Sequence, residues 1–183
     1  MQKTFKGASA ASGEIYDLLT SIKPNDDVIS HFSQFKSNEN LYEKNVNKIS
    51  RAYYTTYNTK KNIQLHIIHA IGPDFRFSTY LQEIIKDTDE TKLFNLIFEL
   101  YEDIYIEFIK NYKLNNKLQL RLLPISTGVF IGQNETYRIK LFKAIIISCM
   151  ILNKKYEINA AIYLYFKSEY DIFNALYAII QNN

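Results

Sequence analysis

Short apolar runs that alternate with segments of helical periodicity constrain the fold of this chain more than any other feature. The clearest run, residues 65–71 (LHIIHAI), is almost continuously apolar, and Gly72-Pro73 ends it. Further runs with strand character cover residues 52–57 (AYYTTY), 118–125 (LQLRLLPI) and 160–166. Apolar strands that alternate with helices are typical of a largely parallel sheet with helices on both faces. We therefore expect an α/β protein with a three-layer α-β-α fold and a mixed, mostly parallel sheet.

Helices are expected over residues 79–111 and about 134–153. A helix that begins near Glu14 is expected to end at Pro24. Residues 168–171 (SEYD) resemble a capping box and should open the final helix. In the second half of the region 79–111, apolar residues recur at spacings of three and four and predict a core face: Phe94, Ile97, Phe98, Tyr101, Ile104, Tyr105 and Phe108.

Length, composition and charge narrow the class of protein. The 183 residues suit one domain, residues 1–183, and 47% of them are apolar, which is enough for a core. The chain has no apolar run of roughly 18 residues and no signal-like N-terminus, so we expect a soluble protein of the cytoplasm or nucleus with no membrane partner. The net charge of +3 is too small to indicate a nucleic-acid partner. Cys149 is the single cysteine and should be a buried thiol, and we expect no disulfide within the chain, no metal and no cofactor.

Residues 126–132 (STGVFIG) form the best candidate for an anion site. They follow a predicted strand and lead into a predicted helix, where backbone N–H groups and the helix dipole favour phosphate. Gly128 and Gly132 should let the backbone approach a ligand and adopt positive φ. Many strand-to-helix turns with glycine bind nothing, so a plain turn is the alternative.

Two segments resemble those of a known family. Residues 66–73 (HIIHAIGP) and 123–132 (LPISTGVFIG) resemble, in sequence and in order, a strand and a loop of macrodomains, which are ADP-ribose-binding modules. Residues 7–16 (GASAASGEIY) are similar to the family's glycine loop, with Ala and Ser at its middle glycines. Residues 162–167 resemble its last strand and the turn after it, so the resemblance extends over residues 6–180.

The resemblance implies that the chain binds ADP-ribose or an ADP-ribosylated protein. By position, the loop at 126–130 should cradle the diphosphate with backbone N–H groups, and Phe130 should lie against the distal ribose. The loop at 8–12 should wrap the ligand from the other side, and Tyr165 or Phe166 should stack on adenine, which contributes about 1–3 kcal/mol per base. The expected ligand-binding residues are Ala8, Ser9, Ala10, Ala11, Ser12, Ser126, Thr127, Gly128, Val129, Phe130, Tyr165 and Phe166.

The chain departs from the family at its beginning. Macrodomains start with two strands that carry an adenine-binding Asp and an N-A-A-N stretch, and neither motif precedes Gly7. Because the second of these strands is central in the family's sheet, three arrangements stay open: its neighbours pair directly, the chain is a fragment, or another chain supplies the strand. The Ala and Ser side chains at 8–12 resist positive φ and hold the backbone away from a phosphate. Two or three losses of about 1–3 kcal/mol each would weaken a micromolar site to nearly millimolar.

The other candidate residues have plainer interpretations. His66 and His69 are three apart on one strand and should face opposite sides of the sheet, so we expect no metal pair. His69 occupies the place of the family's strand histidine, which is more often structural. Asp74 and Arg76 could reach the ligand cleft or belong to the loop surface.

Three functions follow from these observations. The first is weak binding of ADP-ribose or a related nucleotide through the loop at 126–132. The second is a protein-interaction scaffold without a nucleotide ligand, in which a protein partner or self-association completes the sheet. The third is a mono-ADP-ribosyl-protein hydrolase, for which no catalytic residues can be assigned because the motif loops hold no paired carboxylates and no Ser/His/Asp set.

Overall fold

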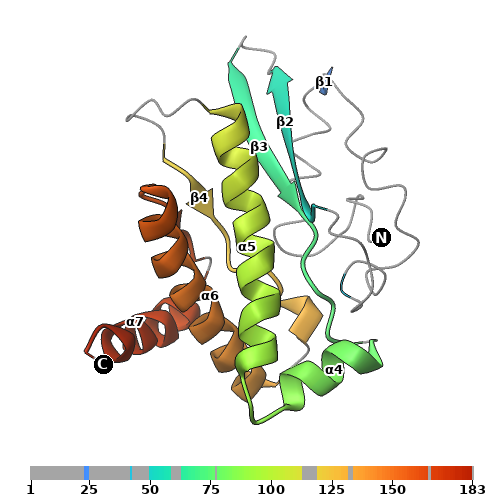
Figure 1. Ribbon diagram of the computed structural model, residues 1–183, viewed down its shortest axis with the longest axis vertical. Coiled ribbons are helices and arrows are strands. Elements are labelled where there is room, and N and C mark those ends of the chain that lie inside the picture. The colour runs from blue at the N-terminus through green and yellow to red at the C-terminus, as the bar shows by residue number, and fades with distance from the viewer. Residues whose placement is uncertain are drawn as a thin grey trace.

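The computed structural model describes residues 23–24, 42, 50–58, 63–76, 78–112, 119–131, 134–164 and 166–182. These residues form a mixed α/β structure (Figure 1), which agrees with the expected class. In chain order the elements are β1 (Lys23–Pro24), β2 (Ala52–Asn58), β3 (Gln64–Ala70), α4 (Thr79–Lys86), α5 (Thr91–Asn111), β4 (Arg121–Leu122), η1 (Val129–Ile131), α6 (Glu135–Tyr156), β5 (Ala161–Ile162) and α7 (Lys167–Gln181).

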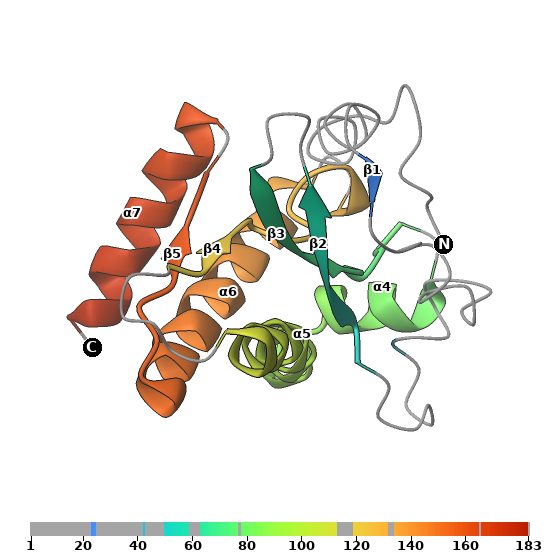
Figure 2. The same ribbon diagram turned by 90° about the horizontal axis from the view of Figure 1, so that it is seen from above.

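The strands form two separate sheets. β2 and β3 pair antiparallel from Ala52↔Ala70 to Asn58↔Gln64, and β1 pairs antiparallel with the end of β2. β4 and β5 form a short parallel pair on the β3 side of the first sheet (Figures 1 and 2). The expectation of an extended, mostly parallel sheet is therefore wrong for the described residues. The connection between β2 and β3 covers only residues 59–63, which permits a hairpin but not the crossover of about a dozen residues that parallel pairing needs.

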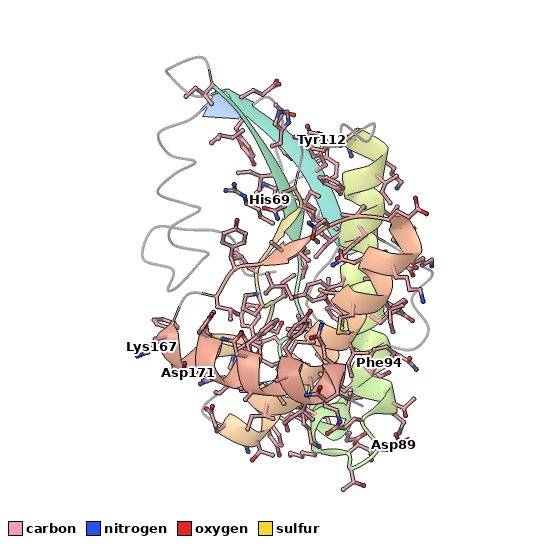
Figure 3. All side chains as sticks on the ribbon, turned by 90° about the vertical axis from the view of Figure 1, so that its left-hand side faces the viewer. His69, Asp89, Phe94, Tyr112, Lys167 and Asp171 are labelled. Atoms are coloured by element: carbon pink, nitrogen blue, oxygen red, sulfur yellow. The ribbon has the colours of Figure 1, made fainter. Side chains whose placement is uncertain are left out.

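The helical region expected at 79–111 is divided into α4 and α5 by a turn at residues 87–90. Ser78 caps α4, because its hydroxyl accepts a hydrogen bond from a backbone N–H of the first turn at 3.2 Å. Asp89, labelled in Figure 3, opens α5: its carboxylate accepts from the backbone N–H and the hydroxyl of Thr91. Side-chain bonds of Ser78 and Asp89 therefore mark the starts of two separate helices within a continuous apolar pattern.

α5 and α6 pack side by side and lie on one side of the strands (Figure 2). The predicted stripe of α5 faces this core, with Phe94 and Phe98 only half-buried at its margin. Cys149 of α6 is buried as expected, and burial raises the pKa of its thiol to about 12. The most deeply buried large side chains of the two helices are Leu93, Ile97, Leu100, Tyr101, Tyr105, Leu141, Phe142, Ile145, Ile146 and Leu152.

α7 packs against α6 but buries little of its own surface. Phe173 meets Phe142 of α6 edge to face, and Glu169 is the one residue within α7 that is buried. The helix starts at Lys167, and Glu169 rather than Ser168 caps it, because the carboxylate accepts from the N–H of Phe166 at 3.3 Å. In the part of the chain that the structure describes, no helix is both long and apolar enough to cross a membrane.

Candidate functional site

The loop expected to bind phosphate lies where the chain leaves β3 and β4. Residues 123–128 follow β4, and η1 leads toward α6, so the loop stands at the carboxyl end of a strand and before a helix. The segment that follows β3 meets it, because the N–H of Phe75 donates to the carbonyl of Phe130 at 2.9 Å. The carboxyl ends of two strands from different sheets therefore come together at this loop.

Ser126 is both strained and buried in this loop. Its φ is 66°, in the left-handed region that non-glycine residues rarely adopt, and only 9% of the residue is exposed. Within the described chain, its hydroxyl has no hydrogen-bond partner. A Cβ at Gly72 would lie 2.4 Å from the Oγ of Ser126 and 2.3 Å from Cγ2 of Ile125, so only glycine fits there. Backbone strain of this kind costs about 1–3 kcal/mol and clusters at functional sites.

The backbone of the loop presents N–H groups that the protein does not use. Among the described residues, no acceptor receives a hydrogen bond from the backbone N–H of Ser126, Gly128 or Phe130. Gly128 is exposed, and a Cβ added to it would meet nothing within 4 Å. The expectation that Gly128 adopts positive φ is wrong, because Ser126 makes the left-handed turn instead. Gly132 lies outside the described residues.

Tyr101 of α5 fixes the base of the loop. Its hydroxyl donates to the carbonyl of Leu123 at 2.8 Å and accepts from the N–H of Ile125 at 3.1 Å. Burial raises the pKa of Tyr101 well above its ordinary value, so the hydroxyl stays protonated and able to donate. The hydroxyl of Thr127 donates to the carbonyl of Pro124 at 2.9 Å and closes the turn.

A cation stands over the ring of Phe130. The guanidinium carbon of Arg76 lies 5.3 Å from the centroid of this ring. Asp74 holds Arg76 through a fork of two bonds, Nε to Oδ1 at 2.9 Å and Nη2 to Oδ2 at 2.7 Å. The hydrogen bonding to Asp74 raises the pKa of Arg76. Of the two interpretations left open for this pair, contact with the candidate site is the one that the geometry favours.

A second arginine lies at the N-terminus of α6. Arg138 donates from Nε to the carbonyl of Thr127 at 3.1 Å, and its Nη1 pairs with Glu135 at 3.0 Å. Asn134 caps the helix by accepting from the N–H of Tyr137, which takes one N–H that would otherwise face an anion. Each of the two arginines at the loop is therefore accompanied by a carboxylate, and the local charge is balanced.

Only part of the expected ligand-binding set lies together. Ser126, Thr127, Gly128 and Phe130 belong to one loop, and Val129 opens η1 within it. Phe166 is 59% exposed and precedes α7. Outside the described residues lie Ala8, Ser9, Ala10, Ala11, Ser12 and Tyr165.

The two histidines of β3 face opposite sides of the sheet, as expected. The Nδ1 of His66 lies 2.6 Å from the hydroxyl of Tyr54, beside Tyr112 at the end of α5. The Nε2 of His69 lies 2.9 Å from the hydroxyl of Tyr57, on the face away from α5 (Figure 3). Burial lowers the pKa of His69 to about 4, so this ring is neutral at pH 7. No group of His, Cys, Asp and Glu among the described residues is arranged to hold a metal ion.

Several residues that shape the site could not be predicted from the sequence. Gly72 is recognisable as the end of a strand, but its close contact with Ser126 depends on how two distant segments meet. Tyr101 belongs to a core stripe, and only its hydroxyl contributes to the loop. Arg138 lies inside a predicted helix, where nothing in the pattern shows that it reaches back to Thr127. The hydroxyl of Tyr101 on a buried helical face is the one signal in the sequence that predicts a polar contact inside the core.

Comparison of the chain with protein-family models found no matching family. Searches of curated proteins and of solved structures likewise found no match. The resemblance to macrodomains therefore rests on the motif residues of this sequence alone.

Proposed function

We propose that the chain binds ADP-ribose or a related nucleotide weakly, through its phosphate groups, at the loop formed by residues 126–130. The observation that carries the proposal is the strained turn at Ser126 beside unused backbone N–H groups. Buried polar groups in proteins are nearly always hydrogen-bonded, so an unpaired buried hydroxyl in a strained turn needs an explanation. Phosphate oxygens accept hydrogen bonds from N–H groups in such positions.

The affinity should be low, for reasons visible around the loop. Asn134 already caps α6, and both Arg76 and Arg138 are paired with carboxylates. A phosphate must therefore compete with internal partners for its hydrogen bonds. Together with the Ala and Ser substitutions at 8–12, this favours a dissociation constant of roughly 0.1–1 mM.

Calorimetric titration of ADP-ribose into the purified protein tests the proposal. Gly128→Glu adds a carboxylate in open space above the loop without a steric conflict, and Gly128→Gln is the matched neutral control. We expect the Gln variant to bind nearly as well as the original chain and the Glu variant to lose binding, because the added charge repels phosphate. Equal binding by the two variants, or no heat with the original chain up to millimolar ADP-ribose, would refute the proposal.

A second candidate, a protein-interaction scaffold, is favoured by the open edge of β3. The N–H of Ile71 donates to the carbonyl of Arg51 at 3.0 Å. In an antiparallel pair, residues alternate between those whose peptide groups bond the partner strand and those whose peptide groups point away, and Ile71 belongs to the first kind. The peptide groups of Ile68 and Ala70 therefore point away from β2, on the side where β4 lies, and no described residue pairs with them. An unpaired strand edge accepts an added strand from another polypeptide.

Hydrogen exchange distinguishes this candidate from a closed sheet. If the edge is open, the amides of Ile68 and Ala70 should exchange much faster than that of Ile71, which is bonded within the sheet. A self-associating scaffold should also show concentration-dependent mass in light scattering. Strong protection of both amides in a strictly monomeric sample would contradict the scaffold.

The hydrolase alternative has weaker support. Asp74 and Glu135 are the acidic side chains that contact the two arginines at the loop, and both are held in ion pairs. A carboxylate held by a guanidinium is not positioned against a substrate proton, as a general base must be.

A further inference from the structure

The turn at residues 74–76 fixes a cation against the candidate phosphate loop. The backbone N–H of Arg76 donates to the Oδ1 of Asp74 at 3.1 Å, in addition to the two bonds from its guanidinium. The side chain of Gln82 donates to the carbonyl of Arg76 at 2.7 Å. Both the backbone and the side chain of Arg76 are therefore held in place beside Phe130.

The geometry of this fork is the one by which arginine binds phosphate. A carboxylate and a phosphate both offer two oxygens to the parallel N–H groups of a guanidinium, and phosphate carries more charge. The side chains of Arg76 and Asp74 are 27% and 15% exposed, so the fork is partly shielded from water yet reachable from solvent. Shielding strengthens the competition between the two anions for one cation.

Ser126 is a second, independent observation on the loop that Arg76 contacts through Phe130. It is 9% exposed, and its hydroxyl has no partner among the described residues. It lies against Gly72, where the segment after β3 meets the loop after β4. The fork and the unpaired hydroxyl are therefore on the two segments that meet at one site.

We propose that Arg76 is a phosphate-binding residue of this site and that Asp74 occupies its fork until a ligand phosphate replaces it. The inference rests on the proposed function and deepens it by naming the ligand class. The site should prefer compact, multiply charged phosphates such as diphosphates, because the charge of Arg76 lies over Phe130 in the loop with the unused backbone N–H groups. On binding, the phosphate accepts the hydrogen bonds from Nε and Nη2, and the carboxylate of Asp74 turns to solvent.

Titration of pyrophosphate into the original chain, Arg76→Gln and Asp74→Asn tests this exchange. Arg76→Gln removes the cation, so we expect binding to weaken about tenfold or more. Asp74→Asn removes the competing anion while keeping the shape of the side chain, so binding should strengthen severalfold. If the ion pair only held the turn together, both variants would weaken the site alike. Circular dichroism checks that each variant is folded. The direction of the change in affinity in Asp74→Asn then shows whether the carboxylate competes with phosphate or only supports the turn.

The possible results separate this inference from the proposed function. Two results would overturn the role of Arg76 and leave the loop as a site. One is weaker pyrophosphate binding by Asp74→Asn. The other is unchanged pyrophosphate binding by Arg76→Gln while Gly128→Glu still abolishes ADP-ribose binding. No heat with pyrophosphate or ADP-ribose, for the original chain and for Asp74→Asn, overturns both.

Discussion

Ser126→Gly should stabilise this protein, although Ser126 lies in the candidate binding loop. A left-handed conformation costs an L-residue about 1–2 kcal/mol, and glycine adopts a φ of 66° without this cost. Removing a buried hydroxyl that lacks a partner relieves about 1–3 kcal/mol more. Glycine also gains freedom in the unfolded chain, which offsets about 0.4–1 kcal/mol. The net increase in the free energy of unfolding should be about 1–5 kcal/mol.

Thermal unfolding followed by circular dichroism measures this change. For a domain of this size, Tm rises about 2–4 °C per kcal/mol, so we expect an increase of roughly 2–20 °C. Gly72→Ala perturbs the same contact from the opposite side, since its Cβ would come within 2.4 Å of the Oγ of Ser126. This control should lower stability by about 1–3 kcal/mol through overpacking.

A loss of stability in Ser126→Gly would refute the reasoning, because it would mean that the hydroxyl makes a stabilising bond or that the turn is not strained. The same variant also separates stability from function. If the hydroxyl serves a ligand, the more stable protein should bind ADP-ribose more weakly than the original chain.

Three further predictions concern the groups that support the site and the core. Tyr101→Phe should lower the free energy of unfolding by about 1–3 kcal/mol in a denaturant titration, because Leu123 and Ile125 lose their shared partner; an unchanged midpoint would contradict this. Acid should destabilise the protein through His69, whose pKa is about 4 when folded and 6.5 when free, so its contribution is complete above pH 6.5 and is lost as the pH falls toward 4. The loss is up to about 3 kcal/mol, and His69→Gln should flatten the dependence of Tm on pH in this window. Cys149, with a thiol pKa of about 12, should react with a thiol reagent at neutral pH only after denaturation, and rapid labelling of the folded protein would show that it is not buried.

The elements predicted correctly are those whose signal is repeated along the chain. The apolar stripe of α5 extends over many turns, so its periodicity predicts helix and buried face together. The long apolar run of α6 predicts a helix, but it does not single out one buried face. The division between α4 and α5 was missed because it depends on two side-chain bonds at Asp89 that periodicity does not contain. β4 and β5 are far shorter than the apolar runs that predicted them, since strand character in a sequence does not supply a pairing partner.

The arrangement of the strands was only partly accessible from the sequence. The hairpin of β2 and β3 could have been recognised from the short connection at residues 59–63, which excludes a parallel crossover. The separation of β3 from β4 could not, because which strands are neighbours depends on contacts between distant segments.

The candidate site shows the same limit. The loop at 126–130 was located by its position after a strand and before a helix, and the structure places it there. The strain at Ser126 was not predicted, because glycine is the usual residue at positive φ and Gly128 was two residues away. The position of Arg76 over Phe130 brings together residues more than fifty positions apart, which no local pattern in a single sequence contains.

The shallow attachment of α7 has a consequence for how the molecule opens. The free energy needed to open one element increases with the apolar surface that it buries against the rest. Phe166, Tyr170 and Ile179 are 59%, 57% and 59% exposed, whereas the α5–α6 pair contains side chains that are fully buried. α7 should therefore detach in a local fluctuation at a fraction of the cost of global unfolding. Amide exchange in α7 should then report this sub-global event, and α7 and the α5–α6 pair should open as two cooperative units of unequal stability.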